Sequence, residues 1–205
     1  GQAGNSGLLQ TFLAGYLVQT LLFDKAIPTD ALMISSVIGF ITIPLLGWLS
    51  DKVGRRLPYI IVNISAIILA WPMLAIIVDK SYSASTIMLS LIVIHNVAVL
   101  GLFALENITM AEMFGSRNRF TRMAISKEAG GLVAVGFGPV LAGIFCNVTG
   151  SWWPIVAMLI CYSAIGLISS LLMPEVCDRD LSLDHDAADA GTRQALSANG
   201  QYAKS

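Results

Sequence analysis

Six continuously apolar stretches, separated by short polar segments, dominate this chain. They cover approximately residues 7–23, 31–49, 58–78, 85–110, 129–148 and 152–173. A helix that rises 1.5 Å per residue needs about 20 residues to cross roughly 30 Å of hydrocarbon, and the first stretch is at the short limit of that length. A membrane β-barrel would instead show segments of about ten residues that alternate apolar and polar side chains. The pattern therefore predicts an all-α membrane protein with a six-helix transmembrane bundle.

Composition supports a membrane protein and excludes one class of function. Hydrophobic residues make up 56% of the chain and charged residues only 12%, whereas an ordinary soluble domain has about 25% charged residues. The mean hydropathy is +0.75. The formal net charge is -1, so the chain lacks the dense Lys/Arg face that nucleic-acid binding requires.

The three cysteines, Cys146, Cys161 and Cys177, form no CxxC motif and have no histidine at ligand spacing. They are interpreted as packing residues, and neither a metal site nor a cofactor is predicted. The chain begins with Gly, and its first apolar stretch lacks a basic leader, so a shortened chain is favoured over a signal peptide.

Basic residues predict the orientation, because cytoplasmic loops carry an excess of Lys and Arg. One side of the predicted bundle holds only Lys25 and Lys80, and the other holds Lys52, Arg55, Arg56, Arg117, Arg119, Arg122 and Lys127. Both ends of the chain are thus expected on the cytoplasmic side of a plasma membrane. We expect the bundle to cover residues 1–173 and a disordered, aspartate-rich cytoplasmic tail to cover residues 174–205.

A glycine- and charge-containing motif joins the second and third predicted helices. It reads Gly47-Trp48-Leu49-Ser50-Asp51-Lys52-Val53-Gly54-Arg55-Arg56. It resembles the G-x-L-(A/S)-D-(R/K)-x-G-R-R signature of the major facilitator superfamily. Glycine allows close helix packing or a tight turn, and the charged residues can bind partners at nearby helix ends.

A second motif narrows the resemblance. The sequence Ala111-Glu112-Met113-Phe114-Gly115-Ser116-Arg117-Asn118-Arg119-Phe120-Thr121 is similar to a segment of the metabolite:proton symporter family, although Arg122 stands where that family has a small residue. This family carries shikimate, 2-oxoglutarate, citrate, and proline or betaine.

The resemblance implies the C-terminal half, helices 7–12, of a secondary transporter in the bacterial inner membrane. Such a half would work with a missing N-terminal half, by alternating access, and would import a small polar metabolite together with protons. An organic acid such as shikimate is favoured, and proline or betaine remains open. Substrate would bind between the halves, so this chain would supply half of a binding site.

Polar residues inside the predicted helices are candidate site residues, because they are costly in lipid. His95 and Glu106 lie eleven residues apart, about three helical turns, which predicts one stripe, and Asn96 and Asn107 repeat that spacing. The resemblance makes this the tenth helix, which lines the central cavity with the seventh, where Tyr16 and Gln19 are candidates. Glu106 and His95 are candidates for proton coupling. An ordinary interhelical hydrogen bond remains an alternative for His95 and Asn96.

Charged residues at the cytoplasmic edge are predicted to form a conformational gate, in which Glu112 pairs with an arginine. The predicted gate consists of Gly47, Asp51, Gly54, Arg55, Arg56, Glu112 and Arg119. Lys127 and Glu128, at the start of the next helix, are predicted to be solvated.

A stripe of small residues marks the fifth predicted helix at every fourth position. Gly130, Ala134, Gly138 and Ala142 would allow close packing against a helix of the missing half.

Two other functions are alternatives to a transporter. An intramembrane hydrolase would need a Gly-x-Ser-Gly nucleophile loop, which the sequence lacks, so no enzyme is predicted. A stand-alone structural or regulatory membrane protein remains open.

Overall fold

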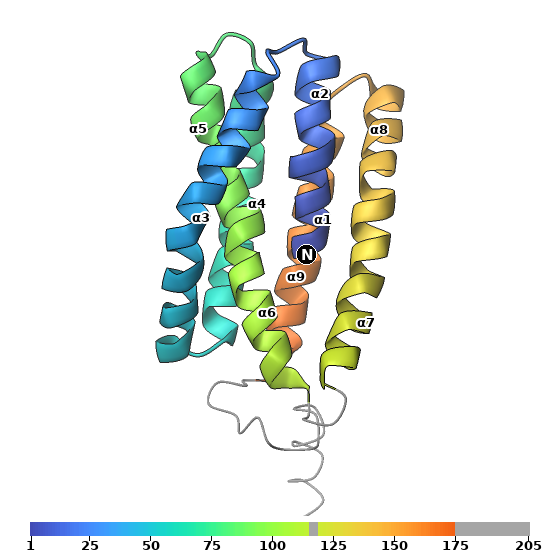
Figure 1. Ribbon diagram of the computed structural model, residues 1–205. Coiled ribbons are helices and arrows are strands. Elements are labelled where there is room, and N and C mark those ends of the chain that lie inside the picture. The colour runs from blue at the N-terminus through green and yellow to red at the C-terminus, as the bar shows by residue number, and fades with distance from the viewer. Residues whose placement is uncertain (115–118, 175–205) are drawn as a thin grey trace, which may run out of the picture.

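The computed structural model describes residues 1–114 and 119–174 as an elongated bundle of roughly parallel and antiparallel helices (Figure 1). The predicted tail lies outside the described residues, except for Pro174. Five segments are long and apolar enough to cross a membrane: Ala26–Val53, Arg56–Val78, Ala84–Met113, Arg119–Thr149 and Trp153–Leu172. The prediction of an all-α membrane bundle is confirmed.

The first predicted span, over residues 7–23, has different bounds in the structure and is not one of the five membrane-length segments. It is a continuous helix, here called the first helix, made of α1 (Gln2–Ser6), the π-helical segment η1 (Gly7–Leu13) and α2 (Ala14–Gln19). It is not among the five membrane-length segments, because glutamines and an asparagine interrupt its apolar pattern. One face of it nevertheless lies at the centre of the bundle, where Leu8, Leu13 and Leu17 are fully buried.

The other helices follow in up-and-down order. They are α3 (Ala26–Val53), α4 (Arg56–Val78), α5 (Ala84–His95), η2 (Asn96–Gly101), α6 (Leu102–Met113), α7 (Arg119–Gly131), η3 (Leu132–Phe137), α8 (Gly138–Thr149) and α9 (Trp153–Leu172). The segments α5, η2 and α6 form one helix, and α7, η3 and α8 form another. The end of the bundle with the α3–α4 turn and the start of α7 is here called the basic end (Figure 1).

The sequence explains where several helices begin and end. Gly54, with φ of 96°, stops α3, and Gly150, with φ of 62°, stops α8, because this region of backbone space suits glycine. The Ser83 side chain accepts the Thr86 amide at the start of α5. These turns keep the connections short and the helices side by side.

Large apolar side chains cover the outside of the bundle as well as its centre, whereas small residues line the inner face of α3. Phe40, Val148 and Leu172 are each 80% exposed. The buried positions of α3, by contrast, are mostly small and recur on one face: Pro28, Ala31, Ser35, Gly39, Gly47 and Ser50. An apolar exterior with small residues between helices is the arrangement expected in lipid.

Candidate functional site

Arg55 joins the α3–α4 turn to the end of α6 at the basic end of the bundle. Its Nε donates to Oε2 of Glu112 at 2.8 Å, and its Nη2 donates to Oε1 at 2.6 Å. The two side chains are only 8% and 12% exposed. A two-armed, charge-assisted pair of this kind is strong and fixes orientation as well as distance. The prediction that Glu112 pairs with one of the nearby arginines is confirmed for Arg55.

The α3–α4 turn positions Arg55 for this contact. Gly54 reverses the chain, and Nη1 of Arg55 donates to the buried Ser50 hydroxyl at 2.7 Å and to the Asp51 carboxylate. Hydrogen bonding to Glu112, and then to Asp51, raises the pKa of Arg55 above its ordinary value. The guanidinium therefore stays charged at any physiological pH, and a movement of the helices can break the pair.

Arg56 and Arg119, the other predicted gate arginines, donate to backbone carbonyls. Nη2 of Arg56 donates to the Leu171 carbonyl in the last turn of α9 at 2.6 Å. Nε of Arg119 donates to the Phe114 carbonyl at 3.1 Å. Arg56 therefore ties the α3–α4 turn to the end of α9, whereas Arg55 ties it to α6.

A second polar cluster is buried inside the bundle around His95, which is 2% exposed. Nε2 of His95 lies 2.8 Å from Nε2 of Gln10 in η1, and Nδ1 lies 2.7 Å from the Ser35 hydroxyl in α3. Asn96 donates to the same hydroxyl at 2.7 Å. The cluster therefore connects the first helix, α3 and the α5–η2 junction.

The orientation of the Gln10 amide decides which ring nitrogen of His95 carries the proton. With the amide nitrogen toward Nε2, as described, Gln10 donates to Nε2, so Nδ1 carries the proton and points to Ser35. The Ser6 hydroxyl bonds to Oε1 of Gln10 at 3.1 Å. A doubly protonated ring would need an acceptor at Nε2, so protonation would require the Gln10 amide to turn over.

Two of the three π-helical segments meet at this cluster. Gln10 lies in η1, and Asn96 is the first residue of η2. A π-helical segment shifts the register of a helix and often marks a functional site. His95 and Asn96 were predicted site residues, whereas Gln10 and Ser35 were not, although both are polar residues inside predicted helices, the signal that could have found them.

Tyr16 and Gln19 lie together at a groove between the first helix and α8, near the end of the bundle opposite the basic end. The groove has a volume of about 510 Å³, and its lining also includes Thr11, Pro139 and Asn147. The two residues predicted for the seventh helix therefore share one surface. His95 does not line this groove.

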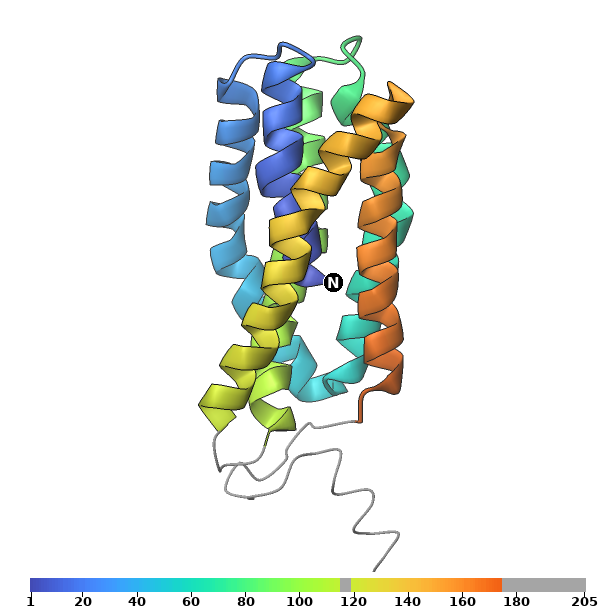
Figure 2. The same cartoon turned by 90° about the vertical axis from the view of Figure 1, so that its right-hand side faces the viewer.

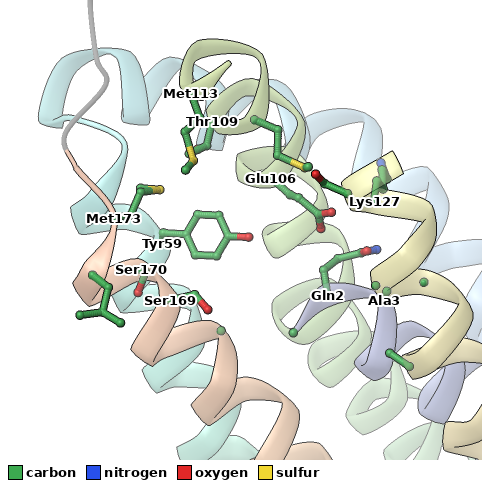
Figure 3. A pocket seen from close by; sticks show the side chains of 18 of the residues that line it. Gln2, Ala3, Tyr59, Glu106, Thr109, Met113, Lys127, Ser169, Ser170 and Met173 are labelled. Atoms are coloured by element: carbon green, nitrogen blue, oxygen red, sulfur yellow. The ribbon is translucent and has the colours of Figure 1, made fainter. Parts of the chain in front are cut away.

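Glu106 lines a different cavity, which lies near the basic end and has a volume of about 680 Å³; Asn107 is not among its lining residues. Figure 3 shows Glu106, Gln2 and Lys127 on one side of it and Tyr59, Ser169 and Ser170 on the other. Lys127 donates to Oδ1 of Asn107 at 2.7 Å, and its ammonium lies 5.1 Å from the Phe103 ring centre. The expectation that Lys127 is merely solvated is corrected, because it has partners within the bundle.

The single polar stripe predicted from His95 to Glu106 is also corrected. His95 is enclosed by Gln10 and Ser35, whereas Glu106 lines the cavity at the basic end. The segment η2 lies between them and changes the angular advance per residue, so a spacing of eleven residues no longer returns to the same face.

The small residues of the fifth predicted span have two kinds of neighbour. A Cβ atom added at Gly138 would lie 3.0 Å from the Tyr162 hydroxyl of α9, and Ala142 is fully buried. These two positions therefore pack inside the bundle, not on an outer face as the sequence suggested. At Gly130 an added Cβ would meet no atom within 4 Å, and Ala134 lines the cavity of Glu106.

Within residues 1–114 and 119–174, the structure shows no group of three His, Cys, Asp or Glu side chains that could hold a metal ion.

Comparison with known proteins identifies the family of this bundle. The sequence pattern of the Major Facilitator Superfamily matches residues 2–193. The chain belongs to the Major Facilitator Superfamily. No solved structure matches the chain significantly.

Two relatives within the Major Facilitator Superfamily are from Escherichia coli (strain K12). "Putative transporter YdfJ" is 76% identical over 198 residues, which are 97% of this chain and 46% of YdfJ. "Shikimate transporter" is 22% identical over 169 residues, which are 82% of this chain and 38% of that protein. The chain therefore spans less than half the length of these curated relatives.

Proposed function

We propose that this chain is the second six-helix half of a secondary transporter that imports a small polar metabolite by proton symport and alternating access. The observation that carries the proposal is the buried cluster of His95, Gln10 and Ser35, which connects three helices of a Major Facilitator Superfamily bundle. A titratable group at such a junction can link the binding of a proton to a helix movement.

In the proposed mechanism His95 binds the coupled proton. Once protonated, its ring donates from both nitrogens, so the Gln10 amide turns its oxygen toward Nε2 and its nitrogen toward the Ser6 oxygen. The hydrogen bond between the first helix and His95 then has opposite directions in the two protonation states. Glu106 is the second candidate for proton coupling, because its carboxylate borders a cavity and is one of few acidic groups within the helices.

The gate of the proposed transporter is the Arg55–Glu112 pair with Asp51. In alternating access these contacts close the cytoplasmic side in one state and open in the other. Tyr16 and Gln19, on the groove of the first helix, are the proposed contacts to substrate. An organic acid is the favoured substrate class, because one relative is named a shikimate transporter.

The test uses a completed transporter, defined here as this chain with the part of YdfJ that it does not cover fused before Gly1. His95→Asn keeps a polar group of similar size but cannot be protonated near neutral pH. In proteoliposomes with an inward proton gradient, the variant should lose accumulation of labelled shikimate while shikimate exchange without a gradient continues. Ser36→Ala is the matched control, because Ser36 is next to Ser35 but is exposed and donates to the Leu32 carbonyl of its own helix.

Unchanged accumulation in the His95→Asn protein would remove His95 from proton coupling. Loss of both exchange and accumulation would assign His95 a structural role instead. The same pair of assays with Glu106→Gln decides whether Glu106 carries the proton.

A further inference from the structure

Ser35 of α3 is the hydrogen-bond partner of His95 on the Nδ1 side of the ring. Its hydroxyl is fully buried, lies 2.7 Å from Nδ1 and also accepts from Asn96 at 2.7 Å. The first helix, α3 and the helix made of α5, η2 and α6 lie side by side around this cluster (Figures 1 and 2). Two elements therefore meet the ring from different sides, α3 at Nδ1 and the first helix, through Gln10, at Nε2.

The direction of the Asn96 contact is fixed by a backbone carbonyl. Nδ2 of Asn96 also lies 3.0 Å from the Ile92 carbonyl oxygen, which can only accept a hydrogen bond. Turning the amide over would bring its oxygen against that carbonyl oxygen, so Nδ2 stays in place and donates to Ser35 as well. One of the two lone pairs of the Ser35 oxygen is thus occupied by Asn96, and one remains for His95.

Ser35 can accept from His95 in both protonation states of the ring. In the neutral ring with its proton on Nδ1, and also in the protonated ring, Nδ1–H points to the remaining lone pair of Ser35. The hydrogen of Ser35 is then free to turn to a carbonyl of its own helix, as the Ser36 hydroxyl does to the Leu32 carbonyl. Protonation therefore changes the direction of the contact with Gln10 but not that of the contact with Ser35.

Protonation does change the strength of the contact with Ser35. A hydrogen bond that a charged group donates is roughly twice as strong as one between neutral groups. Ser35 therefore stabilises the protonated ring of His95 more than the neutral ring. The Asn96 amide has the opposite effect, because its Nδ2–H group places partial positive charge on the same oxygen. Two uncharged neighbours thus act on the titration of His95 in opposite directions.

Ionisable side chains on the elements packed against His95 lie on other surfaces. They are Tyr16 on the first helix, Asp30 on α3, Tyr59 on α4 and Glu106 on α6. The first lines the groove with α8, the second is exposed near the start of α3, and the other two line the cavity at the basic end. Among the described residues, the hydrogen-bond partners of the ring are Gln10 and Ser35, and both are uncharged.

We propose that Ser35 and Asn96 are positioning residues that together set the pH at which His95 takes up a proton. Ser35 holds Nδ1 and accepts its hydrogen in both states, and Asn96 weakens Ser35 as an acceptor through a donation of fixed direction. This inference rests on the proposed function, which gives that proton its role in transport. Both residues act through His95 and make no contact with substrate in the proposal.

The position of the ring proton tests the inference without any change to the cluster. The chain has two histidines, His95 and His185, so His185→Gln leaves a single ring to observe. The 205-residue chain with isotope-labelled histidine is placed in lipid nanodiscs, and its ring nitrogens are followed by NMR from acid to alkaline pH. At alkaline pH the proton should be on Nδ1. A proton on Nε2 would overturn the proposal, because Ser35 would then donate to the ring.

Substitutions in the same chain separate the two roles. Ser35→Ala should move the titration midpoint of His95 to lower pH by about one unit, because the protonated ring loses a charge-assisted bond. Asn96→Leu, with a side chain of similar size, should move the midpoint to higher pH. Ser35→Thr, which keeps the hydroxyl, and the control Ser36→Ala should both keep it near that of the unmodified chain. Shifts of the same sign for Ser35→Ala and Asn96→Leu, or no shifts, would overturn the proposal.

Transport measurements distinguish this inference from the proposed function. In the completed transporter, the pH profile of shikimate accumulation should move with the titration midpoint in each variant. Midpoints that move as expected while accumulation ignores them would support the positioning roles and contradict proton coupling through His95. If His95→Asn abolishes accumulation but Ser35→Ala leaves the midpoint unchanged, the inference fails and the proposed function stands.

Discussion

Arg55 shows how much one side chain can determine in this bundle. It reaches Glu112 on α6, Ser50 and Asp51 on α3, and is itself the residue before α4. The guanidinium remains charged, and both carboxylates accept from it, so the pair is satisfied only while these helix ends stay together. Such a contact can hold one conformation without fixing the protein permanently.

Breaking the Arg55–Glu112 pair should abolish uptake by the completed transporter. Arg55→Ala removes both hydrogen bonds that Arg55 donates to the partly buried Glu112, which costs about 3–5 kcal/mol in the state that forms the pair. We expect Arg55→Ala and Glu112→Ala each to lose uptake while the amount of inserted protein stays nearly normal. Uptake in proteoliposomes and protein recovered in washed membranes are the two measurements.

Lys52→Ala is the control for this prediction, because Lys52 lies in the same motif but is exposed and stacks on the Trp48 ring at 4.0 Å. Exchange of the two charges, Arg55→Glu with Glu112→Arg, should recover part of the uptake. Near-normal uptake in the Arg55→Ala protein would exclude Arg55 from the gate.

The helices of this bundle depart from regular geometry where they carry polar residues. The segments η1 and η2 bring Gln10 and Asn96 to the same buried cluster, and η3 lies in the helix that contains the glycines of α7. Close contacts between helices depend on glycine at particular positions, as where Gly4 meets the Tyr162 ring. Which polar groups come into contact therefore depends on where the π-helical segments and the glycines lie in each helix.

A methyl group at Gly4 should separate the first helix from α9. The added Cβ would lie 2.6 Å from the Tyr162 ring, so the ring or one of the two helices must move, at a cost of about 1–3 kcal/mol. Gly15→Ala, on the same helix but with no atom within 4 Å, should be neutral or stabilise by up to about 1 kcal/mol. Thermal unfolding of the 205-residue chain in detergent, followed by circular dichroism, should show a lower Tm for Gly4→Ala only. Equal Tm values for both variants would contradict the close contact.

Sequence predicted the elements of this fold better than it predicted their meeting points. Apolar length alone located five membrane-length helices, and the motif with Arg55 placed the basic turn. The first helix was harder, because its glutamines and Asn5 lower its apolar content although its leucines are central. The π-helical segments carry no distinctive side-chain pattern, so the separation of His95 from Glu106 could not be predicted from spacing.

At the scale of the whole molecule, one face of the bundle carries an open groove, and the chain is shorter than its relatives. The groove with Tyr16 and Gln19 is open along the first helix and α8, and the chain covers 46% of YdfJ. In folds built from two such bundles the substrate lies between the halves near the middle of the membrane. One bundle then offers half of the polar contacts and no closed path across the lipid.

We therefore expect the 205-residue chain to insert into membranes but not to transport. In vesicles with an inward proton gradient, the chain alone should accumulate no labelled shikimate, and the completed transporter should accumulate it, because only two bundles can enclose a substrate and alternate its access. Flotation of the chain with vesicles and its resistance to alkaline extraction serve as the control for insertion. Accumulation by the chain alone would contradict its proposed role as one half of a transporter. If neither protein accumulates shikimate but both insert, and the completed protein accumulates proline or betaine instead, the two-bundle arrangement stands and the substrate class changes.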